Sequence, residues 1–597
     1  MSDRGDSTLP FLAPLLTGRA ARRYGVLIAL WGAGLLFFWQ WWLRPEHVGS
    51  AGRYGLVTAL LAWLTFLEIY FVVVFTRARR SCAPQPRPEQ HRVAMVVTKT
   101  PSEPFSVVQR TLEAMLSQDH PHDTWLADED PSPETADWCT RHDVRISTRR
   151  GRTDYHRPVW PRRTRCKEGN LAFFYDHWGY SDYDIVVQMD ADHVPQPGYL
   201  VEMLRPFADP AVGYVSAPSI CAANAKAHWA ARTRLHTEGA FHGILQAGYN
   251  NGLATMCIGS HYAVRTAALR AVGGLGPELA EDHSTTMILN AGGWRGVHAI
   301  DAIAIGDGPA TVADMVTQEF QWSRSLMTLL LQHSGRYLPK MPLRLRAQFL
   351  FCQLLYPLLA ITLAIMYLLP MTALVFDVTY AEVTFPAYVG HAIPSILALI
   401  AIAVALRRDG LFRPLDAPVL SWERVLFVLM QWPWVFWGCA MALKDCLTGR
   451  FVDFRITPKG DAAKGRLPMK VLAVYAIIAL GCLVPVLMVD RAQQSGGFYL
   501  LALFSGMLYV TIVVVTVFRH HMENSMTWSP ADIAPQLGLV VVLVAMTGWC
   551  FMDRIGPGAH ALLMGIDGIV VAKPLYYVAG AGGGAAGRVT YKLNFLW

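Results

Sequence analysis

The sequence predicts a membrane protein in which a cytoplasmic α/β domain is inserted between transmembrane helices. Three observations predict this fold: several nearly uncharged runs of roughly 20 apolar residues, a charged central region in which β-rich runs alternate with helical segments, and arginines flanking the first pair of apolar runs. With 53% hydrophobic and 16% charged residues, the 597-residue chain is too apolar for a single soluble domain.

Residues 1–81 are expected to form an N-terminal transmembrane hairpin from the apolar runs 25–43 and 54–75. Arginines lie outside both ends of the hairpin and are sparse in the loop between them, so the positive-inside rule places the N-terminus and the region that follows in the cytoplasm. These flanking residues are Arg19, Arg22, Arg23, Arg77, Arg79 and Arg80. The first run lacks a small-residue cleavage site, which predicts an uncleaved first helix.

Residues 82–340 are predicted to be the soluble domain. Charged residues return here, and short β-rich runs at 93–98 and 185–189 alternate with helix-like segments such as 105–116. This alternation is typical of a domain built on a parallel sheet.

Residues 341–552 are predicted to form a second transmembrane region, followed by a tail at 553–597. Its expected spans are 347–369, 388–406, 467–489, 498–518 and a shorter one at 535–552, which makes seven in the whole chain. Residues 420–447 are apolar too, but basic residues lie at both flanks, Glu423 and Arg424 open the segment and Pro433 lies in its middle. We expect a helix in the membrane interface, with a crossing helix as the alternative.

Charge and cysteine usage exclude several classes. The excess of +7 is dispersed and forms no basic stripe with interleaved aromatic residues, so no nucleic-acid partner is expected, and anionic lipid is the expected partner of the surplus charge. Ten cysteines occur without a CxxC pair, which predicts reduced thiols and neither a disulfide framework nor a zinc site.

The strongest chemical motif is Asp190-Ala191-Asp192, which directly follows the apolar run 186–189. Ligands bind at strand ends in α/β sheets, and two carboxylates there suit a Mg²⁺ or Mn²⁺ ion that bridges a diphosphate. Acidic pairs are also common in surface turns, which is the alternative.

Three further positions carry candidate chemistry. Glu281 and Asp282 follow a glycine-rich turn, and they fit either a helix cap or a general base that accepts the proton of an acceptor hydroxyl. Trp322, in the run 318–322, is either a packed aromatic or a platform for a sugar ring. Asp128 ends a β-rich run and either contacts a nucleoside or begins a turn.

The ordered motifs resemble the catalytic domain of cellulose-synthase-like processive family 2 glycosyltransferases, and the resemblance covers roughly residues 90–470. They are Asp128, residues 190–195, residues 257–260, Glu281-Asp282 and residues 318–322. Residues 454–460, within the segment 450–466, are similar to the gating loop that covers the nucleotide sugar in cellulose synthases. The resemblance implies a GT-A nucleotide-sugar-binding fold.

The resemblance also implies roles for individual residues. Asp128 would contact the uracil, Asp190 and Asp192 would hold the metal and UDP, and Asp282 would be the catalytic base. Lys167, Asn170, Thr457 and Lys459 would bind the donor. The acceptor-binding residues would be Cys257, Gly259, Ser260, Glu281, Gln318, Gln321 and Trp322.

Two positions depart from the family pattern. The family usually has threonine where this chain has Ala280, and arginine where it has Gln321. Loss of the arginine removes a charged group that could donate hydrogen bonds to a phosphate. Arg324 is the nearest substitute in the sequence.

By this resemblance, the expected activity is inverting transfer from a UDP-sugar, with UDP-glucose as the expected donor, to a growing polysaccharide acceptor. The product would be a β-glucan with β-1,3, β-1,4 or mixed linkage, secreted through the protein's own helices in a bacterial inner membrane. The alternatives are a chitin- or hyaluronan-type synthase that uses UDP-N-acetylglucosamine and a non-processive lipid glycosyltransferase. Participation of other secretion subunits is left open.

Two other expectations are negative. A transporter is disfavoured because the expected spans are almost free of ionisable residues. The tail after Met552 has no RxxxR signature, so control by cyclic-di-GMP through the usual domain is not supported.

Overall fold

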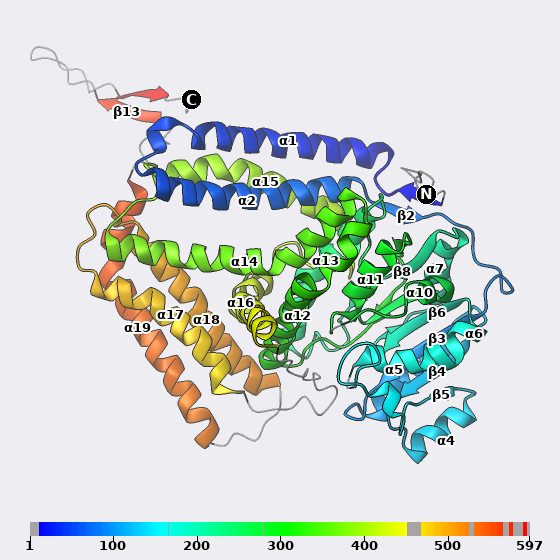
Figure 1. The fold of residues 1–597 in the computed structure, drawn as a ribbon. Coiled ribbons are helices and arrows are strands. Elements are labelled where there is room, and N and C mark those ends of the chain that lie inside the picture. Colours follow the sequence, from blue (N-terminus) through cyan, green and yellow to red (C-terminus); the bar gives the residue numbers. More distant parts are fainter. Residues whose placement is uncertain are drawn as a thin grey trace, which may run out of the picture.

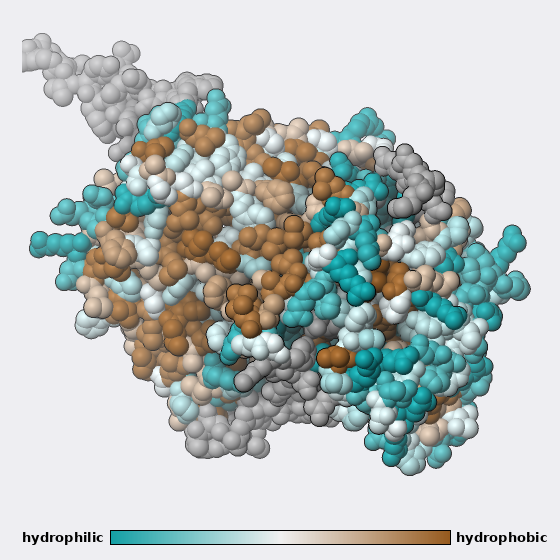
Figure 2. Space-filling view, viewed as in Figure 1, coloured by the Kyte–Doolittle hydropathy of each residue, from teal (hydrophilic) through white to brown (hydrophobic). Residues whose placement is uncertain are grey.

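The computed structural model describes residues 11–164, 166–277, 279–449, 467–523, 530–564, 572–576 and 589–593. It contains a sheet domain and a set of long helices that lie beside it (Figure 1). In Figure 2, hydrophobic residues gather over the helical half and hydrophilic residues over the sheet domain. This arrangement confirms the predicted class, an α/β domain combined with membrane helices.

Eight helices of the described residues are long and apolar enough to cross a membrane. They are α1 (Gly18–Trp42), α2 (Ala51–Thr76), α14 (Leu343–Phe376), α15 (Phe385–Arg408), α16 (Trp422–Thr448), α17 (Met469–Met488), α18 (Phe498–Glu523) and α19 (Pro530–Leu563). Seven of them correspond to the predicted spans, and the eighth is α16. In Figure 1, α1, α2, α14 and α15 run alongside one another, and α17, α18 and α19 form a second group.

Several helix ends differ from the sequence prediction. α14 continues through Pro357 and Pro370 to Phe376, and α19 continues past Met552 to Leu563, so the tail begins later than expected. Neighbouring helices and side chains can satisfy the backbone groups that a proline frees in a membrane helix, which explains why the prolines do not end α14. The structure also pairs β1 (Leu12–Pro14) with β2 (Arg79–Ser81), a contact that the sequence did not indicate.

The sheet domain is built on seven strands in the order β11-β8-β10-β6-β3-β4-β5. Their bounds are β3 (Val93–Lys99), β4 (Asp123–Asp128), β5 (Arg145–Ser147), β6 (Ile185–Asp190), β8 (Val212–Ser216), β10 (His261–Arg265) and β11 (Arg295–His298). The expectation of a wholly parallel sheet is wrong at β10, which runs antiparallel to both β6 and β8. As a result the start of β10 lies beside the end of β6, with His261 opposite Met189.

Both faces of the sheet are covered. On β6, Val187 and Met189 pack into one apolar core and Val186 into a second, because successive side chains of a strand point to opposite faces. The covering helices are α3 (Phe105–Leu116), α4 (Pro133–Arg141), α5 (Lys167–Phe174), α7 (Tyr199–Leu204), α10 (Thr266–Ala271) and α11 (Glu281–Ala291). Three short strands, β7 (Val194–Pro195), β12 (Ala304–Ile305) and β9 (Ser219–Ile220), form a separate small sheet.

Two helices, α8 (Trp229–Ala240) and α12 (Val312–Gln332), connect the sheet domain with the membrane helices through α16. At the first turn of α16, Glu423 lies 3.3 Å from Nε of Arg232 on α8. At its last turn, Asp445 accepts a 2.7 Å hydrogen bond from Nε of Arg324 on α12. Contact with the same domain at both ends favours the interfacial placement of α16, and Figure 1 shows this helix nearly along its axis, crosswise to α14.

Candidate active site

The predicted donor carboxylates lie where β6 ends. Asp190 is the last residue of β6, and its N–H donates to the carbonyl of Ser260 at 2.8 Å. Lys167, the first residue of α5, places Nζ 2.6 Å from Oδ1 of Asp190 and 2.5 Å from the carbonyl oxygen of Gly259. The sheet therefore brings together three residues that the sequence placed far apart.

Asp190, Asp192 and His193 each offer a ligand atom, and these atoms lie within 4.8 Å of one another. Nδ1 of His193 lies 3.3 Å from Oδ1 of Asp192. Burial lowers the pKa of His193, but the hydrogen bonds to Asp192 and Cys221 outweigh burial and raise it to about 10. The contact with His193 holds Asp192 in place, and Asp190 and Asp192 supply carboxylates, the hard oxygen ligands that Mg²⁺ and Mn²⁺ prefer.

The loop before β10 joins the donor carboxylates to the predicted base. The carbonyl of Gly259 accepts from Lys167, while its N–H donates to Oδ2 of Asp282 at 2.7 Å. A Cβ atom at Gly259 would lie 3.2 Å from that carboxylate oxygen, so glycine allows the close approach. Cys257 is buried, and its N–H donates to Oγ1 of Thr286 on α11 at 2.9 Å.

Glu281 and Asp282 occupy the first turn of α11, where the helix dipole favours negative charge. Burial raises the pKa of Asp282, although the N–H groups of His283 and Gly259 oppose that shift by donating to its carboxylate. Burial also raises the pKa of Glu281 to about 8, against the opposing effect of Lys167. Asp282 is therefore both a residue of the helix start and a desolvated carboxylate, so the two interpretations of this motif are compatible.

Asp128 and Asn170 are more enclosed than the sequence suggested. Asp128 is fully buried, and its carboxylate lies 3.0 Å from Nζ of Lys99, a residue at the end of β3. Asn170 is also buried and donates from Nδ2 to the carbonyl of Ala127 at 2.9 Å, so it supports the end of β4. Ser260 is held by the backbone contact to Asp190 described above.

Three of the predicted acceptor residues, Gln318, Gln321 and Trp322, lie on α12, near an arginine from α8. Nη1 of Arg234 donates to Oε1 of Gln318 at 2.8 Å, and its guanidinium carbon lies 4.2 Å from the centroid of the Trp322 ring. Burial raises the pKa of Glu319 to about 8, although nearby Arg234 lowers it. Gln321 is buried on the same helix.

Arg324 does not replace the arginine that is missing at position 321. It is committed to Asp445 on α16, with both side chains mostly buried. Arg234 supplies the cation beside Trp322 instead. Its position could not be found from the motif, because α8 precedes α12 by a long stretch of sequence.

Three other residues either escaped prediction or lie outside the described residues. Lys99 could have been suspected, since a lysine that directly follows a buried strand requires a partner. Thr457 and Lys459, assigned to the gating loop, lie outside the described residues. All ten cysteines are unpaired, as predicted.

Comparison with known proteins places this geometry in a family. Residues 185–406 match the family described as glycosyl transferase family group 2. Cellulose synthase 1 of Komagataeibacter xylinus is 23% identical over 323 residues, which is 53% of this chain and 19% of that protein. The UDP-forming cellulose synthase catalytic subunit of Xanthomonas axonopodis pv. citri (strain 306) is 26% identical over 308 residues, 48% of this chain and 39% of the relative.

This chain thus spans less than half the length of these relatives. Among solved structures, the mannosyltransferase PcManGT from Pyrobaculum calidifontis in complex with GDP-Man and Mn²⁺ aligns with 71% of this chain and 99% of its own, with 15% identity and a TM-score of 0.38. Residues 185–406 thus match a family 2 glycosyltransferase model, and about half of the chain is similar to bacterial cellulose synthases.

Proposed function

We propose that this protein is an inverting, processive glycosyltransferase that polymerises UDP-glucose into a β-glucan and passes the product between its membrane helices. One observation carries the proposal. Lys167 bridges Asp190 and the carbonyl of Gly259, whose N–H binds Asp282, so a donor carboxylate and a candidate base belong to one hydrogen-bonded unit.

The donor half of the site recognises a nucleoside diphosphate sugar. Asp190 and Asp192 would hold Mg²⁺ or Mn²⁺, which neutralises the charge that develops on the departing diphosphate. Lys167 adds a positive charge at the same strand end, and Asn170 supports the strand that ends at Asp128. In this proposal the uracil lies on the Asp128 side, and Thr457 and Lys459 cover the diphosphate.

Asp282 acts as the general base. Its carboxylate accepts the proton of the acceptor hydroxyl while that oxygen attacks the anomeric carbon from the face opposite the diphosphate. The new glycosidic bond forms as the bond from the anomeric carbon to the diphosphate oxygen breaks, and UDP leaves with the bonding electron pair. One displacement inverts the anomeric configuration, so an α-linked donor gives a β-linked product.

The acceptor end lies at the junction with the membrane helices. Trp322 would bind the apolar face of the terminal sugar, with Gln318 and Gln321 on the same helix as polar partners. Gly259, Ser260, Cys257 and Glu281 would border the same space. α12 packs against α16, so a chain that leaves Trp322 reaches the membrane helices directly.

Polymer synthesis by the purified full chain in nanodiscs tests the proposal. The protein receives Mg²⁺ or Mn²⁺ and either radiolabelled UDP-glucose or UDP-N-acetylglucosamine, and the product is digested with linkage-specific glucanases. Insoluble product from UDP-glucose is expected, and the active glucanase identifies a β-1,3, β-1,4 or mixed chain. Incorporation from the N-acetylated donor alone, or only short lipid-linked product, would contradict the proposal.

A further inference from the structure

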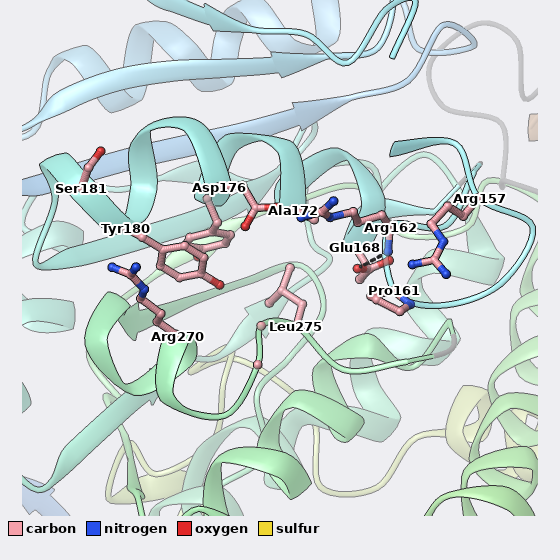
Figure 3. A pocket seen from close by; sticks show the side chains of 13 residues that line it. Arg157, Pro161, Arg162, Glu168, Ala172, Asp176, Tyr180, Ser181, Arg270 and Leu275 are labelled. Atoms are coloured by element: carbon pink, nitrogen blue, oxygen red, sulfur yellow. Dashed lines mark hydrogen bonds and ion pairs between the residues drawn. The ribbon is translucent and has the colours of Figure 1, made fainter. Parts of the chain in front are cut away.

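A cavity of about 490 Å³ lies in the sheet domain and contains none of the donor, base or acceptor residues assigned above. One wall is α5 with the turn that follows it, and the opposite wall is α10 with the turn at 273–275 (Figure 3). The loop that carries Arg157 and Arg162 closes one end. We call this cavity, with Arg157, Arg162, Tyr175, Tyr180 and Arg270 in its lining, the arginine pocket.

The arginine pocket holds positive charge that protein groups do not neutralise. Arg162 is paired, since its Nη2 lies 2.8 Å from Oδ2 of Asp176. Arg157 and Arg270 have no carboxylate partner within the described part of the chain. In Figure 3, Arg270 lies beside Tyr180 at one end of the cavity and Arg157 lies at the other. Guanidinium groups bind phosphate oxygens with planar, bidentate geometry.

The lining contains three arginines and two acidic residues, Glu168 and Asp176, so it keeps a net positive charge. Both carboxylate oxygens of Glu168 accept backbone hydrogen bonds, from the N–H of Arg162 at 2.9 Å and from the N–H of Arg163 at 3.0 Å. The loop is also held from behind by Arg149, a fully buried side chain that donates to the carbonyls of Tyr155 and Arg163. The end wall of the cavity is therefore fixed by the fold before a ligand arrives.

The aromatic wall contains a buried hydroxyl with no partner. Tyr175 is 1% exposed, lines the cavity, and its hydroxyl has no hydrogen-bond partner among the described residues. Leaving such a group unsatisfied costs about 1–3 kcal/mol. The rings of Tyr175 and Tyr180 stack with centroids 5.4 Å apart, and the guanidinium carbon of Arg270 lies 5.9 Å from the centroid of the Tyr180 ring, so an aromatic surface borders this cation.

We propose that the arginine pocket binds a phosphate-bearing ligand with an aromatic ring, of the size of a mononucleotide. Arg157 holds phosphate oxygens at one end of the pocket, the ring lies beside Tyr180 and Arg270 at the other end, and an acceptor atom of the ligand satisfies the hydroxyl of Tyr175. The volume lies within the range of about 300–1,000 Å³ that is usual for small-molecule sites.

The first turn of α5 connects the arginine pocket with the donor site. Glu168, which fixes the loop, directly follows Lys167, whose ammonium contacts Asp190. The wall of the pocket and the donor site therefore share the first turn of α5. The binding step is independent of the proposed glucan synthesis, while its effect on the rate rests on that function.

Binding of AMP to the full chain in phosphatidylcholine nanodiscs with EDTA tests the proposal, with isothermal titration calorimetry as the readout. We expect saturable binding that weakens about tenfold in the R157A/R270A variant and stays within about twofold in R110A/R141A. The second variant is the matched control, because it removes two exposed arginines of α3 and α4 and leaves the pocket intact. Equal weakening in both variants, or no saturable binding to the wild type, would overturn the proposal.

Tyr175→Phe provides a second test, because it should stabilise the ligand-free protein and at the same time weaken AMP binding. Removing an unpartnered buried hydroxyl should raise the thermal midpoint of the ligand-free protein and weaken AMP binding several-fold. A variant that binds AMP like the wild type would contradict the role of the hydroxyl. Pyrophosphate binding as tightly as AMP would remove the aromatic part of the proposal and overturn it. None of these outcomes depends on a polymer assay. Failure of the binding proposal can therefore be distinguished from failure of the proposed glucan synthesis.

Discussion

At the scale of single residues, the site depends on a few backbone groups that hold charged side chains. Gly259 binds Lys167 with its carbonyl and Asp282 with its N–H, and it lacks the side chain that would crowd the carboxylate. The acidic residues at the strand end and the helix start could be predicted from the sequence, because each directly follows a recognisable strand or turn. Lys99, at the end of a buried strand, could have been suspected from the sequence, although its partner could not. Arg234 could not be predicted, because its partners lie in an element distant along the chain.

Replacement of the base is the first prediction at this scale. Asp282→Asn retains an amide oxygen that can accept from Gly259 or His283, so the start of α11 should stay intact. It removes the proton acceptor, and we expect polymer synthesis to fall by about 10²–10⁴-fold. UDP affinity, measured by calorimetry with Mn²⁺, should remain close to that of the wild type. Polymer synthesis at the wild-type rate would remove Asp282 from the role of base.

Arg234 gives the second prediction. Arg234→Lys keeps the positive charge near Glu238 but loses the planar fork that binds Gln318 and covers the Trp322 ring. We expect shorter polymer and about tenfold lower kcat/KM, with a thermal midpoint close to that of the wild type.

Arg232→Lys is the matched control for Arg234→Lys, since Arg232 lies on the same helix and pairs with Glu423 on α16. The control variant should make polymer of normal length. If both lysine variants shorten the polymer equally, the effect belongs to α8 as a whole and the specific role of Arg234 is wrong.

At the scale of elements, the sequence pattern located the long apolar helices and a few elements of the sheet domain, such as β3, β6 and α3, but not the ends of the helices or the directions of the strands. Apolar runs identified the membrane helices, yet α14 passes two prolines and α19 extends beyond Met552, because packing partners decide where such helices end. The antiparallel direction of β10 was missed for a different reason. The alternation of buried side chains is the same for a strand that runs in either direction, so only its pairing with β6 reveals it.

The contact between α12 and α16 gives a prediction at this scale. A Cβ atom at Gly438 of α16 would lie 2.2 Å from Oγ of Ser323 and 2.5 Å from the carbonyl oxygen of Phe320. Gly438→Ala should therefore destabilise the protein by about 1–3 kcal/mol. Because α12 carries Trp322, polymer synthesis should fall as well. Thermal unfolding in detergent measures the first effect and product yield the second.

Gly548→Ala in α19 is the control for this substitution, since nothing lies within 4 Å of its Cβ position. Alanine in an exposed helix position should leave stability unchanged or raise it slightly. If Gly438→Ala is as stable and active as this control, α12 and α16 are not in the close contact that the structure shows.

At the scale of the whole molecule, the orientation of α16 decides the number of spans. By length and composition α16 could cross a membrane, and the sequence alone left that alternative open. The pairs Arg232–Glu423 and Arg324–Asp445 place both of its ends against the sheet domain. We therefore expect this helix of 27 residues, which touches one domain at both ends, to lie along the membrane surface, and the remaining helices would then make seven spans.

Two exposed native cysteines can test this topology. Cys82 follows α2, and Cys446 lies in the last turn of α16. An interfacial α16 places both thiols on the side of the sheet domain, so a membrane-impermeant maleimide should label both in inverted vesicles and neither in right-side-out vesicles. Cys446→Ser and Cys82→Ser variants assign each signal, and Glu46→Cys, in the loop between α1 and α2, should be labelled only in right-side-out vesicles. Labelling of Cys446 from the same side as Glu46→Cys would mean that α16 crosses the membrane, which would give eight spans and a C-terminus on the side of the N-terminus.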